Sequence, residues 1–245
     1  GYKKSLFVPL AESGSTVGAF SEKTAKEIGY SATVVLPATH DTASAVIAAP
    51  LKAQTPYISS GTWSILGVEQ NTAYTGERAL ELNYSNEAGA NGTFRLQQNI
   101  MGLWIIQQIR HELDDKYSFQ EITAMAKKEP SEELIDVNDD KFLAPESMLD
   151  AVYSSLGRKP SLGETAYIVY NSLAVYYDKT LKGLEELTGK TYGTVNIIGG
   201  GSKNDLLNEL TKKRTGKRII TGPTEGTAIG NLMMQMIGTG EIPDL

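Results

Sequence analysis

The C-terminal part of the sequence alternates between strand-like and helix-like patterns, and this alternation constrains the fold more than any other feature. TVNIIGGGS (194–202) is an apolar run followed by a glycine turn, and KNDLLNELTKKRTG (203–216) has a helical pattern. A second strand-like run, KRIITGP (217–223), precedes another helical pattern, for which Thr224 is the predicted N-cap. Successive strands that are joined by helices pair in parallel. The pattern therefore predicts an α/β fold with crossover helices.

Strand patterns nearer the N-terminus make the predicted sheet a mixed one. Residues 55–70 and 92–99 are rich in β-branched and aromatic residues and are separated by turn-forming residues. They predict a meander of strands, and a further short strand is expected at 34–36.

The helical patterns predict one long helix and several short ones. The long helix spans about 162–187, where apolar residues recur at steps of three and four: Ala166, Tyr170, Leu173, Tyr177, Leu181 and Leu184. Short helices are predicted at 101–113, at 119–128 and after Ser21, which would cap a helix that Gly29 ends. The acidic stretch 129–145 is expected to be a surface loop.

Composition limits the classes of partner. The 245 residues allow one large domain or two small ones, and the net charge of −6 without a basic stripe argues against nucleic acid. No apolar run is long enough to span a membrane, and there is no cysteine, so we expect a cytoplasmic protein. Residue 1 is glycine and not methionine, which suggests a piece of a longer polypeptide.

A histidine and an aspartate, His40 and Asp41, follow the predicted strand at 34–36. In HDTASA, Asp41 falls where the strand gives way to a helix of small residues, and the helix dipole would keep its carboxylate ionised and able to accept a proton. The alternative is that Asp41 is only an N-cap. The one other histidine is His111, so His40 has no partner at the spacing of a metal site and is expected to form hydrogen bonds instead.

Two turns combine glycine with hydroxyl residues. SSGTWS (59–64) could direct backbone N–H groups and the Thr62 hydroxyl at a phosphate, or could be an ordinary hairpin turn. IIGGGSKND (197–205) opens a helix but breaks the G-x-G-x-x-G dinucleotide pattern, and the chain has no P-loop and no G-x-S-x-G nucleophile motif. Together the turns suggest a phosphate-bearing ligand held from two sides.

Five motifs in order resemble the C-terminal domain of FGGY-family carbohydrate kinases. They are HDTASAV, SSGTWS, NIMGLW, IIGGGSKNDLLN and GPTEGTAIGN. The resemblance implies an actin-like, ribonuclease H-like fold, an α/β domain whose mixed sheet is flanked by helices. It also implies that residues 1–245 are the C-terminal domain, that the N-terminal kinase domain is absent, and that sugar and MgATP bind between the two domains. The isolated chain is then expected to be inactive or nearly so.

The resemblance also implies roles for single residues. Asp41 matches the family's general base, which also contacts the sugar. His40, Thr42 and Asn99 match residues that bind the sugar in the family. The nucleotide contacts match Thr62, Gln107, Gly200 and Gly201. No residue of this chain matches a metal ligand, although Mg²⁺ accompanies ATP.

The sugar is the least constrained part of this interpretation. The resemblance implies L-rhamnulose, and the histidine of HDTASA separates the chain from glycerol kinases and xylulokinases in the family. Fuculose or xylulose stays an alternative, as does an actin-like module that binds nucleotide without catalysis. A phosphohydrolase built on the His40–Asp41 pair would need more histidines and acids at metal-ligand spacing. Gly226 stands where the family often has alanine, which suggests close helix packing or a slightly altered nucleotide pocket.

Overall fold

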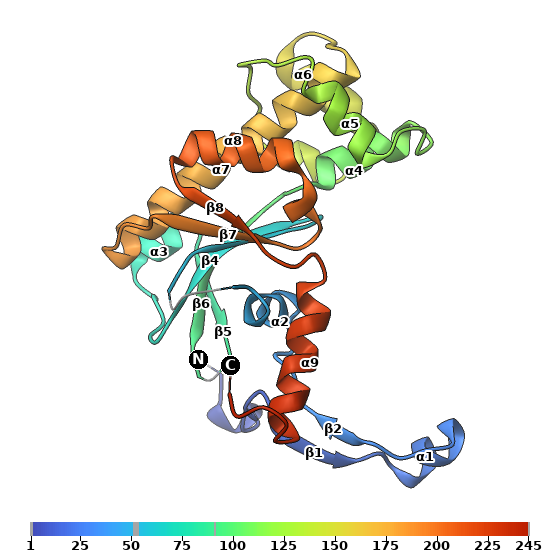
Figure 1. The fold of residues 1–245 in the computed structure, drawn as a ribbon. Coiled ribbons are helices and arrows are strands. Elements are labelled where there is room, and N and C mark those ends of the chain that lie inside the picture. The colour runs from blue at the N-terminus through green and yellow to red at the C-terminus, as the bar shows by residue number, and fades with distance from the viewer. Residues whose placement is uncertain (1, 51–53, 91, 245) are drawn as a thin grey trace.

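A computed structural model describes residues 2–50, 54–90 and 92–244. Its main sheet has six strands in the order β5-β6-β4-β3-β7-β8 (Figure 1). The strands are β3 Tyr57–Ser60, β4 Ser64–Gln70, β5 Ser85–Ala88, β6 Phe94–Ile100, β7 Thr194–Ile198 and β8 Arg218–Thr221. Strands β3, β4, β6 and β5 pair antiparallel, whereas β7 pairs parallel with both β3 and β8. The prediction of a mixed α/β sheet is confirmed.

Helices cover both faces of this sheet, with one group beyond its end. They are α2 Asp41–Ile47, α3 Glu77–Glu81, α4 Trp104–Glu112, α5 Phe119–Ala126, α6 Met148–Leu156, α7 Leu162–Thr188, α8 Asp205–Thr215 and α9 Gly226–Gly238. The short 3₁₀ helices η2 Asp140–Phe142 and η3 Gly200–Lys203 lie in the connections. In Figure 1, α7 and α8 lie on one side of the strands, and α2 and α9 lie on the other.

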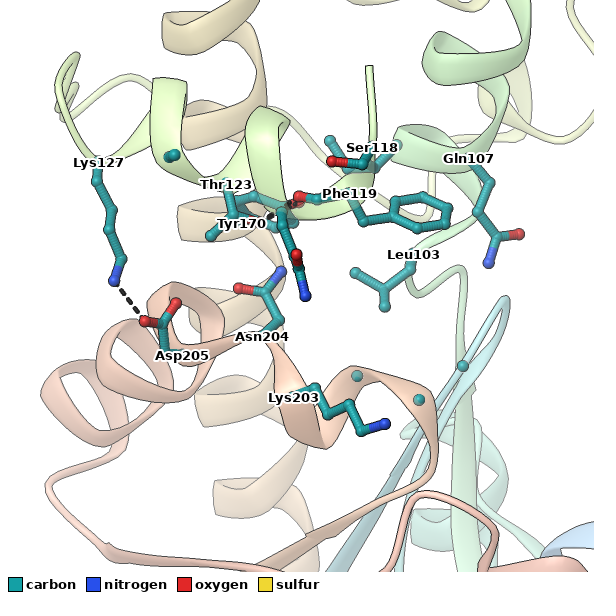
Figure 2. A pocket seen from close by; sticks show the side chains of 16 residues that line it. Leu103, Gln107, Ser118, Phe119, Thr123, Lys127, Tyr170, Lys203, Asn204 and Asp205 are labelled. Carbon is teal, nitrogen blue, oxygen red and sulfur yellow. Dashed lines mark hydrogen bonds and ion pairs between the residues drawn. The ribbon is translucent and has the colours of Figure 1, made fainter. Parts of the chain in front are cut away.

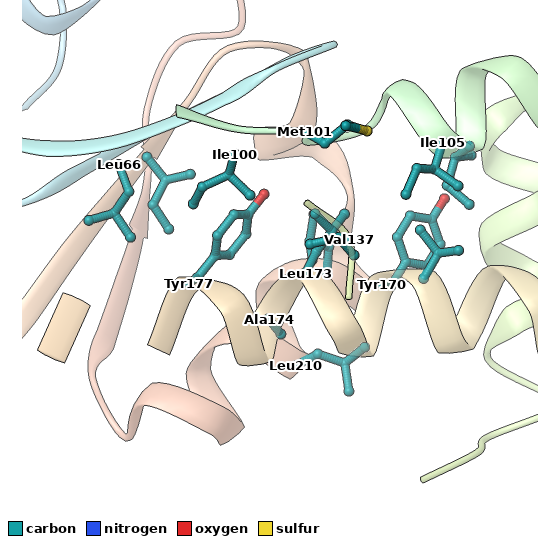
Figure 3. Packing of buried hydrophobic residues seen from close by; sticks show 14 of the residues in the cluster. Leu66, Ile100, Met101, Ile105, Val137, Tyr170, Leu173, Ala174, Tyr177 and Leu210 are labelled. Carbon is teal, nitrogen blue, oxygen red and sulfur yellow. The ribbon is translucent and has the colours of Figure 1, made fainter. Parts of the chain in front are cut away.

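The face toward α7 carries the main hydrophobic core. The predicted stripe of α7 is confirmed, because all six of its residues are buried against the sheet and neighbouring helices. Ile58, Leu66 and Ile100 supply the sheet side of this core from three adjacent strands. Figure 3 shows Leu66 and Ile100 above the Tyr177 side of α7. The three strand residues lie on one face of the sheet, because Ile58 pairs with Leu66, and Ile100 is two residues from Gln98, the partner of Leu66 on β6.

The face toward α2 carries a much smaller cluster. Ala45, Val46 and Ala49 of α2 pack with Tyr57 and Ile198, and Ile65 is half-buried against them. The small residues of α2 also admit α9, which passes so close that a Cβ on Gly230 would lie 1.8 Å from the Ser44 carbonyl oxygen. Gly226, one turn earlier, would bring its Cβ no nearer than 3.4 Å to Ala45, so the strict demand for glycine falls on Gly230.

The N-terminal elements form a separate layer. Strands β1 Thr16–Ala19 and β2 Thr33–Val35 form an antiparallel two-stranded sheet, and α1 Glu22–Ile28 lies between them in sequence, after η1 Lys4–Leu6. The predicted caps of α1 are confirmed. The Ser21 side chain accepts a hydrogen bond from the Thr24 N–H, and Gly29 ends the helix with φ of 85°.

Several predicted boundaries were wrong. The last helix begins at Gly226 after Glu225, with no side-chain cap from Thr224. The predicted helix at 203–216 begins only at Asp205, where the Asn204 side chain caps it, because η3 takes the preceding residues. Helices α3 and α6 and strand β5 were not predicted.

The prediction that 129–145 is only a surface loop was also wrong. Ile135, Val137 and Phe142 of this stretch are buried in the main core. The stretch also holds the chain after β6, because Asn138 accepts a hydrogen bond from the Met101 N–H. Its few apolar residues lack a helical or strand period, so only the tertiary structure shows that they are core residues.

Candidate functional site

The two glycine and hydroxyl turns of the sequence lie against each other at one edge of the sheet. The hairpin turn 61–63 follows β3, and the glycine turn follows β7, which runs parallel to β3 and so ends at the same edge. Contact is direct, since a Cβ on Gly201 would fall 1.9 Å from the Ser60 hydroxyl oxygen. Gly199 has a φ of 83°, and a Cβ there would lie 2.9 Å from the Ser60 carbonyl oxygen. Two segments far apart in sequence therefore form one structure.

The hairpin turn is held from its other side by the start of α4. The Leu103 N–H donates to the Gly61 carbonyl and the Trp104 N–H to the Thr62 carbonyl, at 3.1 and 3.0 Å. Gly102 permits this approach, because its φ is 62° and a Cβ there would overlap the turn's backbone. The motif NIMGLW thus packs on the motif SSGTWS. The Thr62 side chain stays exposed at the tip of the turn.

Helix α7 supports the base of the same turn from inside the core. The Tyr177 hydroxyl lies 2.7 Å from the hydroxyl oxygen of Ser64, the first residue of β4. Burial raises the pKa of Tyr177, so its hydroxyl stays protonated at neutral pH. Both side chains are fully buried. The turn is therefore tied to α7, the longest helix among the described residues.

A pocket of about 680 Å³ opens beside these turns. Figure 2 shows its walls, which come from the α4 region, from α5, from α7 and from the segment of η3 leading into α8. Leu103, Ile106 and Phe119 give it apolar walls, and Gly61, Gly200 and Gly201 form the side next to the turns. A Cβ on Gly200 would meet no atom within 4 Å, so the backbone there is open to a ligand. This size and lining are those of a small-molecule site.

Polar groups are placed around the rim of the pocket. Gln107, Thr123, Tyr170 and Asn204 line it, and in Figure 2 the amides of Gln107 and Asn204 lie on different sides. An ion pair of 2.5 Å between Lys127 Nζ and Asp205 Oδ2 joins α5 to α8 at one end. This pairing raises the pKa of Lys127 and lowers that of Asp205. The pocket can therefore bind an apolar ring with a few directed hydrogen bonds.

The predicted sugar-binding residues lie on the opposite face of the sheet from this pocket. Asn99 pairs with Ile65 across β6 and β4, so its side chain is on the face that α2 covers. His40, Asp41 and Thr42 stand at the start of α2. His40, Asp41 and Asn99 are exposed, whereas Thr42 is buried.

His40, and not Asp41, caps α2. The His40 Nδ1 accepts a hydrogen bond of 3.2 Å from the Thr42 N–H, while Asp41 is the first residue of the helix. The reading of Asp41 as merely an N-cap was therefore wrong. Since Nδ1 is an acceptor, Nε2 carries the proton of the neutral ring and faces outward as a donor. The Asp41 carboxylate is left without a capping duty.

The described part of the chain offers no metal centre of its own and no membrane anchor. Among residues 2–50, 54–90 and 92–244, no three histidine or acidic side chains gather in a way that could hold an ion. Over the same residues, no helix combines the length and apolar character needed to cross a bilayer.

The structure thus divides the predicted site residues into two sets. Gln107, Gly200 and Gly201 line the pocket, and Thr62 stands in the turn beside it. The sequence did not point to Phe119, Thr123, Lys127 or Tyr170 as lining residues. Phe119 opens a short amphipathic helix and Tyr170 belongs to the core stripe, so pattern alone assigns both to packing.

Comparison with known proteins identifies the fold and then the family. A xylulose kinase structure from Lactobacillus acidophilus superposes with a TM-score of 0.74 over 99% of this chain and 50% of that one, at 15% identity. The fold is thus that of an actin-like α/β domain. The model of the FGGY family of carbohydrate kinases, C-terminal domain, matches residues 56–239. The chain belongs to this family.

Its curated relatives are longer proteins. It is 44% identical over 247 residues to the rhamnulokinase of Bacillus subtilis, covering 98% of this chain and 51% of the relative. The rhamnulokinase of Oceanobacillus iheyensis is 40% identical over 252 residues, covering 100% and 53%. The chain therefore spans about half the length of the curated relatives that it matches.

Proposed function

We propose that this chain is the C-terminal actin-like domain, residues 1–245, of an ATP-dependent kinase that converts L-rhamnulose to L-rhamnulose 1-phosphate. The observation that carries the proposal is the division of the site residues between two faces of the sheet: an apolar pocket beside the hairpin turn 61–63 on one face, and the exposed Asp41 on the other. A phosphoryl donor and a sugar could approach this turn from opposite sides. The named relatives, at 40 to 44% identity, support rhamnulose as the sugar.

The pocket fits the nucleoside part of ATP. Its apolar walls would hold the adenine ring, with Gln107 as a polar contact, and the open backbone at Gly200 and Gly201 lets the first phosphates pass closely. The Thr62 hydroxyl and the backbone N–H groups of its turn would then face the terminal phosphate. Phosphoryl transfer depends mainly on such positioning and on charge stabilisation.

The other face would hold the sugar. Asp41 would take the proton from the attacking sugar hydroxyl, and His40 Nε2–H and Asn99 would orient the ring through hydrogen bonds. Thr42 is buried, so it would act through the backbone hydrogen bond that fixes His40. The exposed position of Asp41 suits a group that must meet substrate.

Mg²⁺ would accompany the nucleotide and neutralise its phosphates. The described residues contain no cluster of acids that could enclose it. Mg²⁺ commonly binds through substrate phosphates, water and one or two carboxylates, so this chain would hold it chiefly through the nucleotide.

The first test is sugar-dependent ADP release. A complete kinase that contains this chain should prefer rhamnulose over fuculose, xylulose, gluconate and glycerol, while the 245 residues alone should be nearly inactive. Preference for another sugar would keep the role of Asp41 and discard rhamnulose. Silence with every sugar, with nucleotide still bound, would support a non-catalytic module.

The second test is Asp41→Asn in the complete kinase. Loss of the general base should lower kcat by about 10²- to 10⁴-fold and leave ADP binding nearly unchanged. Asp150→Asn is the matched control, because Asp150 also lies exposed in the first turn of a helix, α6. Near-normal turnover of Asp41→Asn would refute the assignment.

A further inference from the structure

The first 36 described residues have no core of their own. From residue 2 to residue 37 no side chain is buried, and the first buried one is Ala38. Large apolar side chains in this stretch are open to solvent, among them Val8 at 80%, Leu10 at 93% and Val17 at 63% exposure. In an ordinary soluble domain such residues occur singly, so their concentration here indicates a covered surface.

The secondary structure of this stretch also lacks support. Its sheet consists of β1 and β2 alone, so both strands leave one edge unpaired. The helix between them, α1, has no buried residue. A two-stranded sheet is marginal in water unless more strands or a packed helix join it.

The stretch is nevertheless anchored on the side of the molecule that carries Asp41. A Cβ on Gly238, at the end of α9, would fall 2.5 Å from a Val35 methyl group and 2.6 Å from the Gly14 carbonyl oxygen. From β2 the chain continues directly into α2. Figure 1 shows β1, α1 and β2 projecting from the body at the lower end of α9.

We propose that β1 and β2 are two strands of a second sheet, which the preceding half of the kinase polypeptide completes by pairing with their open edge and covering their apolar side chains. This inference rests on the proposed function. Two observations favour this occupant over a second copy of the chain. The relatives are about twice as long as this chain, and the family model for the C-terminal domain starts only at residue 56. Added strands gain affinity from main-chain hydrogen bonds.

Docking there would complete the sugar site. Because β2 leads into α2 and rests on α9, a body seated on β1 and β2 lies on the α2 side of the main sheet. That is the side on which His40, Asp41 and Asn99 are exposed. The preceding half would thus be joined to the segment that carries the base, and the nucleotide pocket would stay on the opposite face of the main sheet.

The test measures amide hydrogen exchange in residues 14–36. It compares the 245-residue chain with a chimera in which the first half of the Bacillus subtilis rhamnulokinase precedes it. Exchange should be fast in the chain alone and at least about tenfold slower in the chimera. Val17→Asp should abolish this protection, whereas Leu80→Asp, a control with 80% exposure on α3, should not.

A second measurement needs only the 245-residue chain. Since Val17 has no core role in it, Val17→Asp should leave the midpoint of thermal unfolding unchanged. Equal exchange in chain and chimera, or a large loss of stability in Val17→Asp, would overturn the proposal. So would a dimer of the 245-residue chain that Val17→Asp dissociates. Protection in a chimera that shows no sugar-dependent ADP release would support the docking surface and count against the proposed function alone.

Discussion

The two faces of the six-stranded sheet are built for different tasks. On the α7 face a continuous apolar core extends from the strands through α7 to the helices around the pocket. On the α2 face the hydrophobic cluster has only five buried residues among those that the structure describes, and the strands beside it carry polar side chains. Arg95 is one of them. It is 1% exposed and pairs with Glu87 at 2.8 Å.

The difference teaches where stability and chemistry reside. The pocket proposed for nucleotide belongs to the heavily packed face, so its walls are fixed before any ligand arrives. The proposed base, Asp41, lies on the α2 face, where little is buried and α9 packs on α2 through Gly230. Substitutions on the two faces should therefore separate stability from site geometry.

The largest effect is expected from Leu173→Ala in the centre of α7. Leu173 is fully buried, and its truncation should lower the free energy of unfolding by about 2–5 kcal/mol. Guanidinium unfolding would measure the loss. Ile65→Ala on the α2 face should cost less, because that side chain is only half-buried. Equal losses would show that the two faces contribute alike.

The second-largest effect is expected from Gly230→Ala on the α2 face. Its methyl group would overlap the Ser44 carbonyl, so α2 and α9 must separate, at a cost of about 1–3 kcal/mol. Gly226→Ala is the matched control and should be tolerated, since its contacts with Ala45 are at 3.4 Å. ADP affinity should stay the same in both variants, because the pocket is on the other face. A weaker ADP affinity in Gly230→Ala would show that packing on the α2 face affects the pocket on the α7 face.

Tyr177→Phe should have a smaller effect with a specific signature. It removes the hydrogen bond to buried Ser64, which should cost about 0.5–1.5 kcal/mol of stability. The loss falls at the hairpin turn that would face the terminal phosphate, so affinity for a non-hydrolysable ATP analogue should weaken while affinity for adenosine should not. Titration calorimetry with both ligands checks this, with Tyr30→Phe, an exposed tyrosine, as control. Equal weakening for both ligands would place the effect in the pocket.

The smallest effect concerns pH and Glu69 on the polar part of the α2 face. Burial raises the pKa of this carboxyl group, so its charged form costs stability at neutral pH, and the cost disappears as the pH falls through the folded-state pKa. Glu69→Gln should therefore be slightly more stable than the parent at pH 7, with no gain at pH values below the ordinary pKa of glutamate. Urea unfolding across this range measures it. A loss at pH 7 would mean that the hydrogen bond from Thr93 and the attraction to Arg95 together outweigh burial.

The sequence was most informative where a period was long. The stripe of α7 spans five turns, so its buried face could be predicted residue by residue, and the alternation after residue 194 predicted the parallel strands. The turns at 59–64 and 197–205 could be linked to phosphate, but only the parallel pairing of β3 and β7 shows that they touch.

Other features depend on contacts that no local pattern encodes. His40 replaces Asp41 as the helix cap because its ring nitrogen reaches the Thr42 N–H, although histidine is not a favoured capping residue. Phe142 is buried inside a stretch dominated by charge, because α6 packs against η2, and Trp104 also donates a hydrogen bond to the Phe142 carbonyl. The exposure of residues 2–37 could not be foreseen either, since their strand and helix signals resemble those of a packed domain.

The open edges of β1 and β2 also set an order of events during synthesis. A chain is synthesised from its N-terminus, so the preceding half of the kinase would already have left the ribosome when these strands emerge. The strands could then pair at once, while the rest of this domain is still being made. Released without that half, they would be templates for pairing between molecules, which is the hazard of any uncovered strand. The fraction of the 245-residue chain that stays unaggregated should accordingly decrease as its concentration in the cell increases.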